Sequence, residues 1–144
     1  MALALGPRLV GYSDDGGPSG GRTRPFLWDG VTLTDLGTSS GPTGQAHDIN
    51  DSGCVVGHYQ TGIQGPTRAC LWQDGAIQDL GVLGGNGDSY AYGINRDDCV
   101  VGSSITGTGE NHAFRWLNGT MTDLGFPVSA AYAINYRHWV VGQA

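Results

Sequence analysis

The chain has 144 residues, the size of a single domain, and its formal net charge is −6. This acidic balance argues against nucleic acid as a partner, because phosphate binding requires clustered basic side chains. No apolar stretch approaches the ~18 residues of a membrane-spanning helix, so no membrane partner is expected. Residues 1–5 lack the basic region of a signal peptide and are too few to form one.

One phrase recurs along the chain and divides it into units. Tryptophans lie 44 residues apart, and each is followed seven residues later by Asp-Leu-Gly. An Ile-Asn pair and a Val-Val-Gly recur at similar distances. The recurring residues are Trp28, Trp72 and Trp116, then Asp35, Asp79 and Asp123, then Asn50, Asn95 and Asn135. A repeat of this length is typical of propellers, solenoids and similar arrays.

In chain order, we expect one repeat domain over residues 1–144. It comprises a partial blade over 8–37, blades over 45–81 and 90–125, and a partial blade over 130–142. The fold class is all-β, with four-stranded antiparallel repeats resembling β-propeller blades. In the best-defined unit, strands a to d are expected over 90–94, 99–103, 113–116 and 120–124, because these runs are rich in β-branched and aromatic residues.

The turns and small residues indicate how each unit is arranged. Asp74-Gly75 and Asn118-Gly119 predict tight hairpins between strands c and d. Asp29-Gly30 lies one residue earlier relative to its tryptophan, so a different turn is expected there. Alanines in the a strands suit a crowded inner position, which would make d the outer strand.

The three cysteines predict no disulfide framework. Cys54 and Cys99 share one repeat position, which Trp139 fills in the last unit, and Cys70 replaces a phenylalanine. We interpret these cysteines as buried apolar side chains, since no Cys-x-x-Cys spacing is present.

The third unit resembles the HAF repeat, a family found mostly in bacterial extracellular proteins. The resemblance lies in Ala91-Tyr92-Gly93-Ile94-Asn95, Val100-Val101-Gly102, His112-Ala113-Phe114-Arg115-Trp116 and residues 119–125. It extends over residues 8–142, although the first two units replace His-Ala-Phe with Arg24-Pro25-Phe26 and Arg68-Ala69-Cys70. The resemblance implies a secreted protein, although the chain shows no leader, and it implies no reaction or cofactor.

The number of strands does not complete a ring. The order b-c-d, twice a-b-c-d, then a-b makes three units and one surplus strand, whereas propellers usually have four to eight blades. We therefore expect either a homo-oligomer, with two copies forming a six-bladed ring, or a part of a longer protein. A β-trefoil is the alternative fold, and a solenoid remains open.

Repeated polar residues are interpreted as structural. Each Asp of Asp-Leu-Gly is expected to tie its outer strand to a turn, and each Asn of Ile-Asn to begin a turn. The histidines occupy four different repeat positions without metal-ligand spacing, so no metal site is predicted. These histidines are His47, His58, His112 and His138. Calcium binding at residues 84–88 or Asp14-Asp15, and glycosylation at Asn118, are weaker readings than ordinary turns.

No catalytic residues are predicted. The chain has no Gly-x-Ser-x-Gly elbow, no phosphate-binding loop and no single pair of carboxylates, and Ser103-Ser104 has no nearby histidine in the sequence. The leading hypothesis is a non-catalytic interaction or scaffold module. The alternative is a carbohydrate-binding module in which Tyr12, Tyr59 and Tyr132 stack on sugars, and an enzyme fragment ranks third.

Overall fold

The computed structural model describes residues 6–16 and 21–144, and its strands lie within those ranges. The first sheet contains β1 (Leu9–Asp14), β2 (Thr23–Trp28) and β3 (Leu33–Asp35). The second contains β4 (Gly44–Ile49), β5 (Val55–Gln60), β6 (Thr67–Gln73) and β7 (Ala76–Gly81). The third contains β8 (Ser89–Ile94), β9 (Val100–Ile105), β10 (Asn111–Leu117) and β11 (Thr120–Pro127). The fourth contains β12 (Ala130–Ile134) and β13 (Val140–Gln143).

Within each sheet, every strand pairs only with its neighbours in sequence, and all pairs are antiparallel. The predicted succession a-b-c-d is therefore confirmed, with strand d at the edge opposite strand a. Within residues 6–16 and 21–144, the first sheet has no strand a, and the fourth has no strands c and d. The fold is all-β, and its described strands form separate antiparallel sheets rather than a closed barrel.

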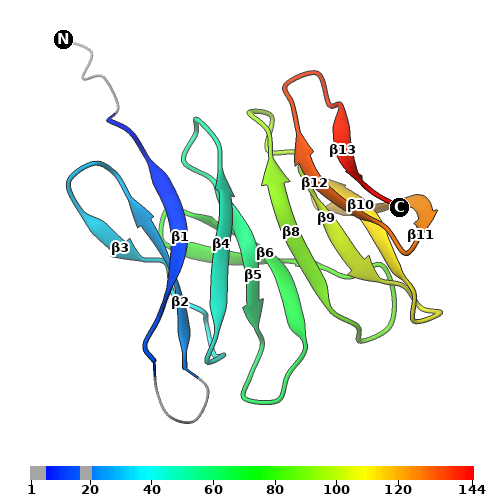
Figure 1. Cartoon of the computed structure of the whole chain (residues 1–144), viewed down its shortest axis with the longest axis horizontal. Helices are drawn as coiled ribbons and strands as arrows, with labels where there is room; N and C mark the ends of the chain where they lie inside the picture. Colours follow the sequence, from blue (N-terminus) through cyan, green and yellow to red (C-terminus); the bar gives the residue numbers. More distant parts are fainter. Residues whose placement is uncertain (1–5, 17–20) are drawn as a thin grey trace.

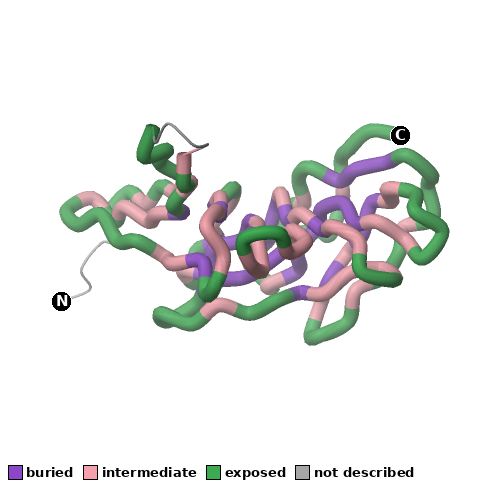
Figure 2. Tube along the Cα trace, turned by 90° about the horizontal axis from the view of Figure 1, so that it is seen from below, coloured by how far each residue is buried: buried purple, intermediate pink, exposed green. Residues whose placement is uncertain are grey.

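The four sheets are stacked face to face in the order of the sequence (Figure 1). Strand β4 lies beside β8, and β8 beside β12, so the first strands of successive units share one side of the molecule. We call the face of a sheet that looks toward the next sheet its forward face, and the opposite face its backward face. Buried residues run through the middle of the stack, whereas the first sheet is mostly half-buried or exposed (Figure 2).

An apolar cluster fills each space between sheets, because period-two alternation gives each strand one forward and one backward set of side chains. Val10 and Leu36 of the first sheet meet Val55, Cys70 and Trp72 of the second. The next space is filled by Val56, Leu71 and Leu80 against Val100, Phe114 and Trp116. The last is filled by Val101, Ala113 and Leu124 against Ala131, Ile134 and Val140.

The a strands approach one another closely because their residues are small. Ala46, Ala91 and Ala131 are all buried. A Cβ atom at Gly93 of β8 would lie 3.0 Å from the carbonyl oxygen of Tyr132 in β12. The expectation that small residues mark a crowded strand is thus confirmed.

The hairpin turns follow the glycine signals. Asn118 and Gly119 both have positive φ, 50° and 85°, as do Asp74 and Gly75, so two residues connect each pair of c and d strands. In the first sheet, residues 29–32 make a longer turn in which the Asp29 carboxylate accepts the N–H of Thr32 at 2.8 Å. The expected difference at Asp29-Gly30 is confirmed.

Candidate functional site

An asparagine follows each a strand, and the first two of these asparagines join their sheet to the next one. Nδ2 of Asn50 donates to the carbonyl oxygen of Asn95 at 2.9 Å, and Nδ2 of Asn95 donates to that of Asn135 at 3.1 Å. The Oδ1 atoms of Asn50 and Asn95 also accept the N–H groups of Cys54 and Cys99, both at 3.0 Å. We call this series the asparagine ladder. Its structural role is confirmed, and Nδ2 of its last member, Asn135, has no partner within the described residues.

The aspartate of each Asp-Leu-Gly closes its own turn. Its Oδ1 accepts the N–H of the glycine two residues later, at 2.8 Å for Asp35 and 2.7 Å for Asp79 and Asp123. These glycines have φ between 76° and 86°, which explains why glycine recurs there. The hydrogen bond from Gly125 lowers the pKa of Asp123, with a smaller contribution from His112. The predicted structural role of these aspartates is confirmed.

The second carboxylate oxygen of each aspartate binds a side chain that differs between units. Asp35 lies 3.8 Å from Nε of Arg24, Asp79 accepts from the Tyr59 hydroxyl at 3.3 Å, and Asp123 lies 2.8 Å from Nδ1 of His112. His112, the first residue of the HAF motif, therefore fixes the outer strand of its own sheet. Nε2 of His112 is buried without a hydrogen bond, and the nearest carboxylate oxygen, on Glu110, is 3.7 Å away.

The serines considered as nucleophiles make no hydrogen bond to this histidine in the described residues, although Ser104 faces His112 in the β9–β10 pair. Ser103 and Ser104 are both buried, and Oγ of Ser104 accepts the N–H of Leu83 at 2.9 Å. Among the described residues, the hydrogen bond of the His112 imidazole goes to Asp123 and not to a hydroxyl or thiol. In acyl transfer, a His-Asp pair activates a hydroxyl or thiol that is hydrogen-bonded to the imidazole, and the described residues show no such bond to His112.

A row of rings follows the a strands. His47, Tyr92 and Tyr132 occupy one repeat position, and each is the extra residue of a β-bulge, which re-aims its side chain. The ring centroids of His47 and Tyr92 are 5.6 Å apart, and those of Tyr92 and Tyr132 are 5.5 Å apart. His58 and Tyr90 extend the series, with 4.9 Å between their centroids. We call these five residues the ring row.

The histidines of the ring row contact each other. Nε2 of His47 lies 3.1 Å from Nδ1 of His58, because β4 pairs with β5 and the bulge turns His47 toward His58. Burial, and then the neighbouring His47, lower the pKa of His58 to about 4, and burial lowers the pKa of His47. Both imidazoles are therefore neutral at pH 7. Their different repeat positions concealed this contact in the sequence, but the shared position of His47, Tyr92 and Tyr132 was visible there.

The described residues contain no group of three histidine, cysteine or acidic side chains that could hold a metal ion. The carboxylates considered for calcium accept hydrogen bonds from the backbone. Asp14 accepts the N–H of Gly16 at 2.9 Å, and Asp88 accepts the N–H of Thr67 at 2.8 Å. The three cysteines are free and buried, as expected, and burial raises the pKa of Cys54 to about 11.

The tyrosines considered for sugar binding differ in exposure. Tyr12 and Tyr132 are exposed, with 49% and 46% of their surface accessible. Tyr59 is buried in the cluster between the first and second sheets, so its ring is not displayed to a sugar as the carbohydrate-binding alternative would require. Its position opposite Arg68 in the β5–β6 pair and its hydroxyl bond to Asp79 make it part of the core.

Equivalent positions change from buried to exposed at the end of the stack. Cys54 and Cys99 are buried on forward faces, whereas their counterpart Trp139 is 67% exposed. Val56 and Val101 are fully buried, whereas Val141 is 63% exposed. On the backward face of the first sheet, Leu33 is 64% exposed. Both ends of the stack therefore present apolar faces of the kind that are covered between its middle sheets.

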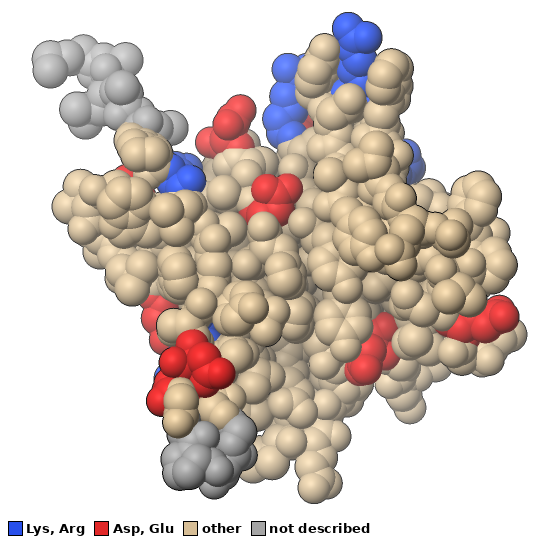
Figure 3. Space-filling view, in the orientation of Figure 1, with Lys and Arg blue, Asp and Glu red and all other residues tan. Residues whose placement is uncertain are grey.

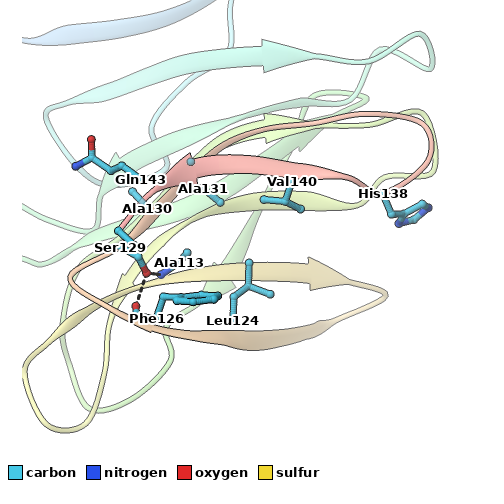
Figure 4. Close-up of a pocket in the computed structure, with 11 residues that line it drawn as sticks. Ala113, Leu124, Phe126, Ser129, Ala130, Ala131, His138, Val140 and Gln143 are labelled. Carbon is cyan, nitrogen blue, oxygen red and sulfur yellow. Dashed lines mark hydrogen bonds between the residues drawn. The ribbon is translucent and has the colours of Figure 1, made fainter.

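A cavity of about 440 Å³ lies where the fourth sheet stops short (Figure 4). Its floor is the forward face of the third sheet, with Ala113 and Leu124, and its wall is the edge of β13, with Val140 and Gly142. Ser129 fixes the rim, because its Oγ accepts the N–H of Ala113 at 2.9 Å and donates to the carbonyl oxygen of Phe126. The cavity is lined mainly by apolar groups.

Charge does not mark a further site on the face seen in Figure 3, where scattered acidic and basic residues interrupt a mostly uncharged surface. In the described part of the chain, no helix is long and apolar enough to cross a membrane. No family model matches the chain, and no curated protein or solved structure is detectably similar to it.

Proposed function

We propose that the chain is a non-catalytic interaction module that continues its stack with further sheets of the same kind, as blades of a β-propeller. The observation that carries this proposal is the exposure of Trp139 and Val141 at positions that are buried in the preceding units. The partner sheets come from a second copy or from further repeats of a longer protein. The resemblance to bacterial extracellular HAF repeats belongs to the same proposal.

Two features support stacking over the binding of an unrelated partner. The forward face of the fourth sheet repeats the chemistry of faces that already pack against a following sheet three times in this chain. The asparagine ladder also ends in an Nδ2 group of Asn135 without a partner in the described residues, although Asn50 and Asn95 each donate to the following sheet. A further sheet of the same kind would supply the missing carbonyl.

Sedimentation velocity of Val141→Glu tests the proposal. A carboxylate on the forward face would have to be buried unpaired on assembly, so the variant should be monomeric at concentrations where the wild-type protein is associated. Ile63→Glu is the matched control, because Ile63 is 86% exposed in a loop and its charge should leave association unchanged. A wild-type protein that sediments as a 15.0 kDa monomer at every concentration would contradict assembly by copies.

A second function, carbohydrate binding, is favoured by one observation. The bulges display one ring per unit at the same repeat position, and aromatic faces stack on the apolar faces of sugars. Glycan-array binding should then fall on Tyr132→Ala, which removes an exposed ring of the row. Tyr136→Ala is the control, since Tyr136 is similarly exposed but lies outside the ring row. An array with no bound glycan would dismiss this function.

A further inference from the structure

The cavity beside β13 lies at the position that a phenylalanine ring occupies in the first and third sheets. In the third sheet, a Cβ atom added to Gly102 would lie 2.9 Å from the Phe114 ring, so the ring rests directly on this glycine. In the first sheet, a Cβ atom added to Gly11 would lie 3.1 Å from the nearest atom of the Phe26 ring, so this ring also lies directly against a glycine. In the third sheet the same Cβ atom would also lie 1.9 Å from the carbonyl oxygen of Tyr90 in strand a, and in the second sheet Gly57 faces Cys70 instead of a ring.

The fourth sheet has the glycine without a phenylalanine. Gly142 is the counterpart of Gly102 and Gly11, and it lines the cavity. A Cβ atom at Gly142 would lie 2.0 Å from the carbonyl oxygen of Ala130, so strand a already requires this glycine. The floor is also equivalent, because Ala113 and Leu124 correspond to Ala69 and Leu80, which pack against Phe114 one unit earlier. Phe114 is completely buried there. Within the described residues, no aromatic side chain from a c strand fills the cavity.

We propose that Phe26 from strand β2 of a second copy fills this cavity, and that β2 and β3 of that copy complete the fourth sheet as its missing strands c and d. This inference rests on the proposed assembly; it specifies a second copy as the partner and exchange of strands as the way in which the copies associate. By analogy with β1–β2, where Gly11 faces Phe26 and Val10 faces Leu27, Gly142 would face Phe26 and Val141 would face Leu27 of the second copy. The composite sheet has the order β12-β13-β2-β3.

Strand β1 of the second copy must leave β2 for this exchange. β1 is an edge strand, with Leu9 and Tyr12 about half exposed, and it carries the same Val-Gly pair as β13. The pairing that β2 loses with β1 is replaced by pairing with β13, while β12 adds a strand a, which the described residues of the first sheet do not supply. Exchange of equivalent elements is a low-cost route to dimers, because most contacts are replaced in kind.

The asparagine ladder supports this arrangement. The composite sheet would pack on the second sheet of the partner copy, as the first sheet does within one chain, and Nδ2 of Asn135 would donate to the carbonyl oxygen of Asn50 there. The sequence has Ala4 at the corresponding place before β1, which offers no such amide. The ladder would thus run without interruption through both copies.

The exchange also determines the size of the assembly. Each copy contributes two complete four-stranded sheets and shares in two composite sheets, so two copies form a closed ring of six sheets. Six lies within the usual range of four to eight blades, whereas three copies would require nine. We therefore expect a dimer rather than an open polymer, because a head-to-tail contact that closes on itself stops growing.

Two cysteine pairs in the full chain test the exchange. Val10→Cys with Leu27→Cys joins β1 to β2 within one copy, and Val141→Cys with Leu27→Cys joins β13 to β2 between copies. Facing residues of antiparallel strands have Cα atoms about 4.5–5.5 Å apart, within the range of a disulfide. The native thiols should stay inert, because all three are buried and their pKa values are raised.

Light scattering should show the first variant as a monomer when oxidised and a dimer when reduced, which makes the reduced protein its own folding control. The second variant should give a disulfide-linked dimer of twice 15.0 kDa in non-reducing gels. An oxidised first variant that still forms dimers would overturn strand exchange but leave assembly through the end faces intact. A wild-type protein that remains monomeric would overturn both.

Discussion

The inner and outer faces of this stack carry the same sequence pattern but have different surroundings. Val56 and Val101 lie between two sheets and are fully buried, whereas Val141 occupies the same repeat position and is mostly exposed. The comparison shows that burial in this chain is set by whether a neighbouring sheet is present rather than by residue type. Each repeat unit has apolar residues on both faces, whether or not a neighbouring sheet covers them. Within the described residues, no further sheet covers the forward face of the last unit.

The largest expected contrast lies between two tryptophans. Trp72 fills the cluster between the first and second sheets, and its Nε1 donates to the carbonyl oxygen of Gly37 at 3.1 Å. Trp72→Ala should lower the free energy of unfolding by roughly 3–5 kcal/mol, because it leaves a cavity. Urea unfolding at a concentration where the protein is monomeric measures this, with Trp139→Ala as the near-neutral control. Equal losses from the two variants would abolish the contrast.

Low pH should destabilise the folded protein through His58, which lies in the ring row. The folded-state pKa of His58, about 4, lies below the ordinary value of 6.5, so the unfolded chain binds more protons between these pH values. The free energy of unfolding should therefore fall as pH drops from 6.5 to 4, with up to about 3 kcal/mol from this residue.

Unfolding of His58→Gln across this pH range measures the contribution, and its profile should be flatter than that of the wild-type protein. Tyr90→Phe keeps the ring that packs against His58 and does not titrate in this pH range, so it is the control and should retain the wild-type decline. An unchanged slope in His58→Gln would show that His58 is not held neutral by its surroundings.

The asparagines of the ladder should contribute more to the free energy of unfolding inside the stack than at its end. Asn95→Ala removes one hydrogen bond donated to Asn135 and two accepted from backbone N–H groups. Because Asn95 is buried, the free energy of unfolding should fall by about 2–3 kcal/mol. Asn135→Ala should cost about 1 kcal/mol in the monomer, because Asn135 is exposed. Thermal unfolding compares the stabilities of the two variants. A larger loss of stability in Asn135→Ala than in Asn95→Ala would contradict the greater contribution expected for Asn95.

The smallest effect concerns a hairpin turn away from both interfaces. Gly119 has φ of 85°, which an alanine adopts only with strain, so Gly119→Ala should cost about 1 kcal/mol. Gly107→Ala, in a loop where a Cβ atom has open space and φ is not positive, should be nearly neutral in the same urea titration. A neutral Gly119→Ala would indicate that the turn type differs.

The sequence predicted the strands well because repetition supplied three readings of each element. Glycine and asparagine signals located the turns, and the incomplete first and last units were visible from the strand order. The contact between His47 and His58 was not predicted, because it depends on a bulge that shifts one side chain relative to the strand period. The burial of Tyr59 and the cavity beside Gly142 were also missed, since both arise from the packing of sheets.

Hydrogen exchange of backbone amides at several protein concentrations tests the central claim most directly, because it compares inner and end strands in one sample. We predict that amides of β9 are protected at every concentration, whereas those of β13 gain protection as concentration rises. Protection of β13 that is as high at the lowest concentration as that of β9, or that never increases, would contradict an end face completed by association.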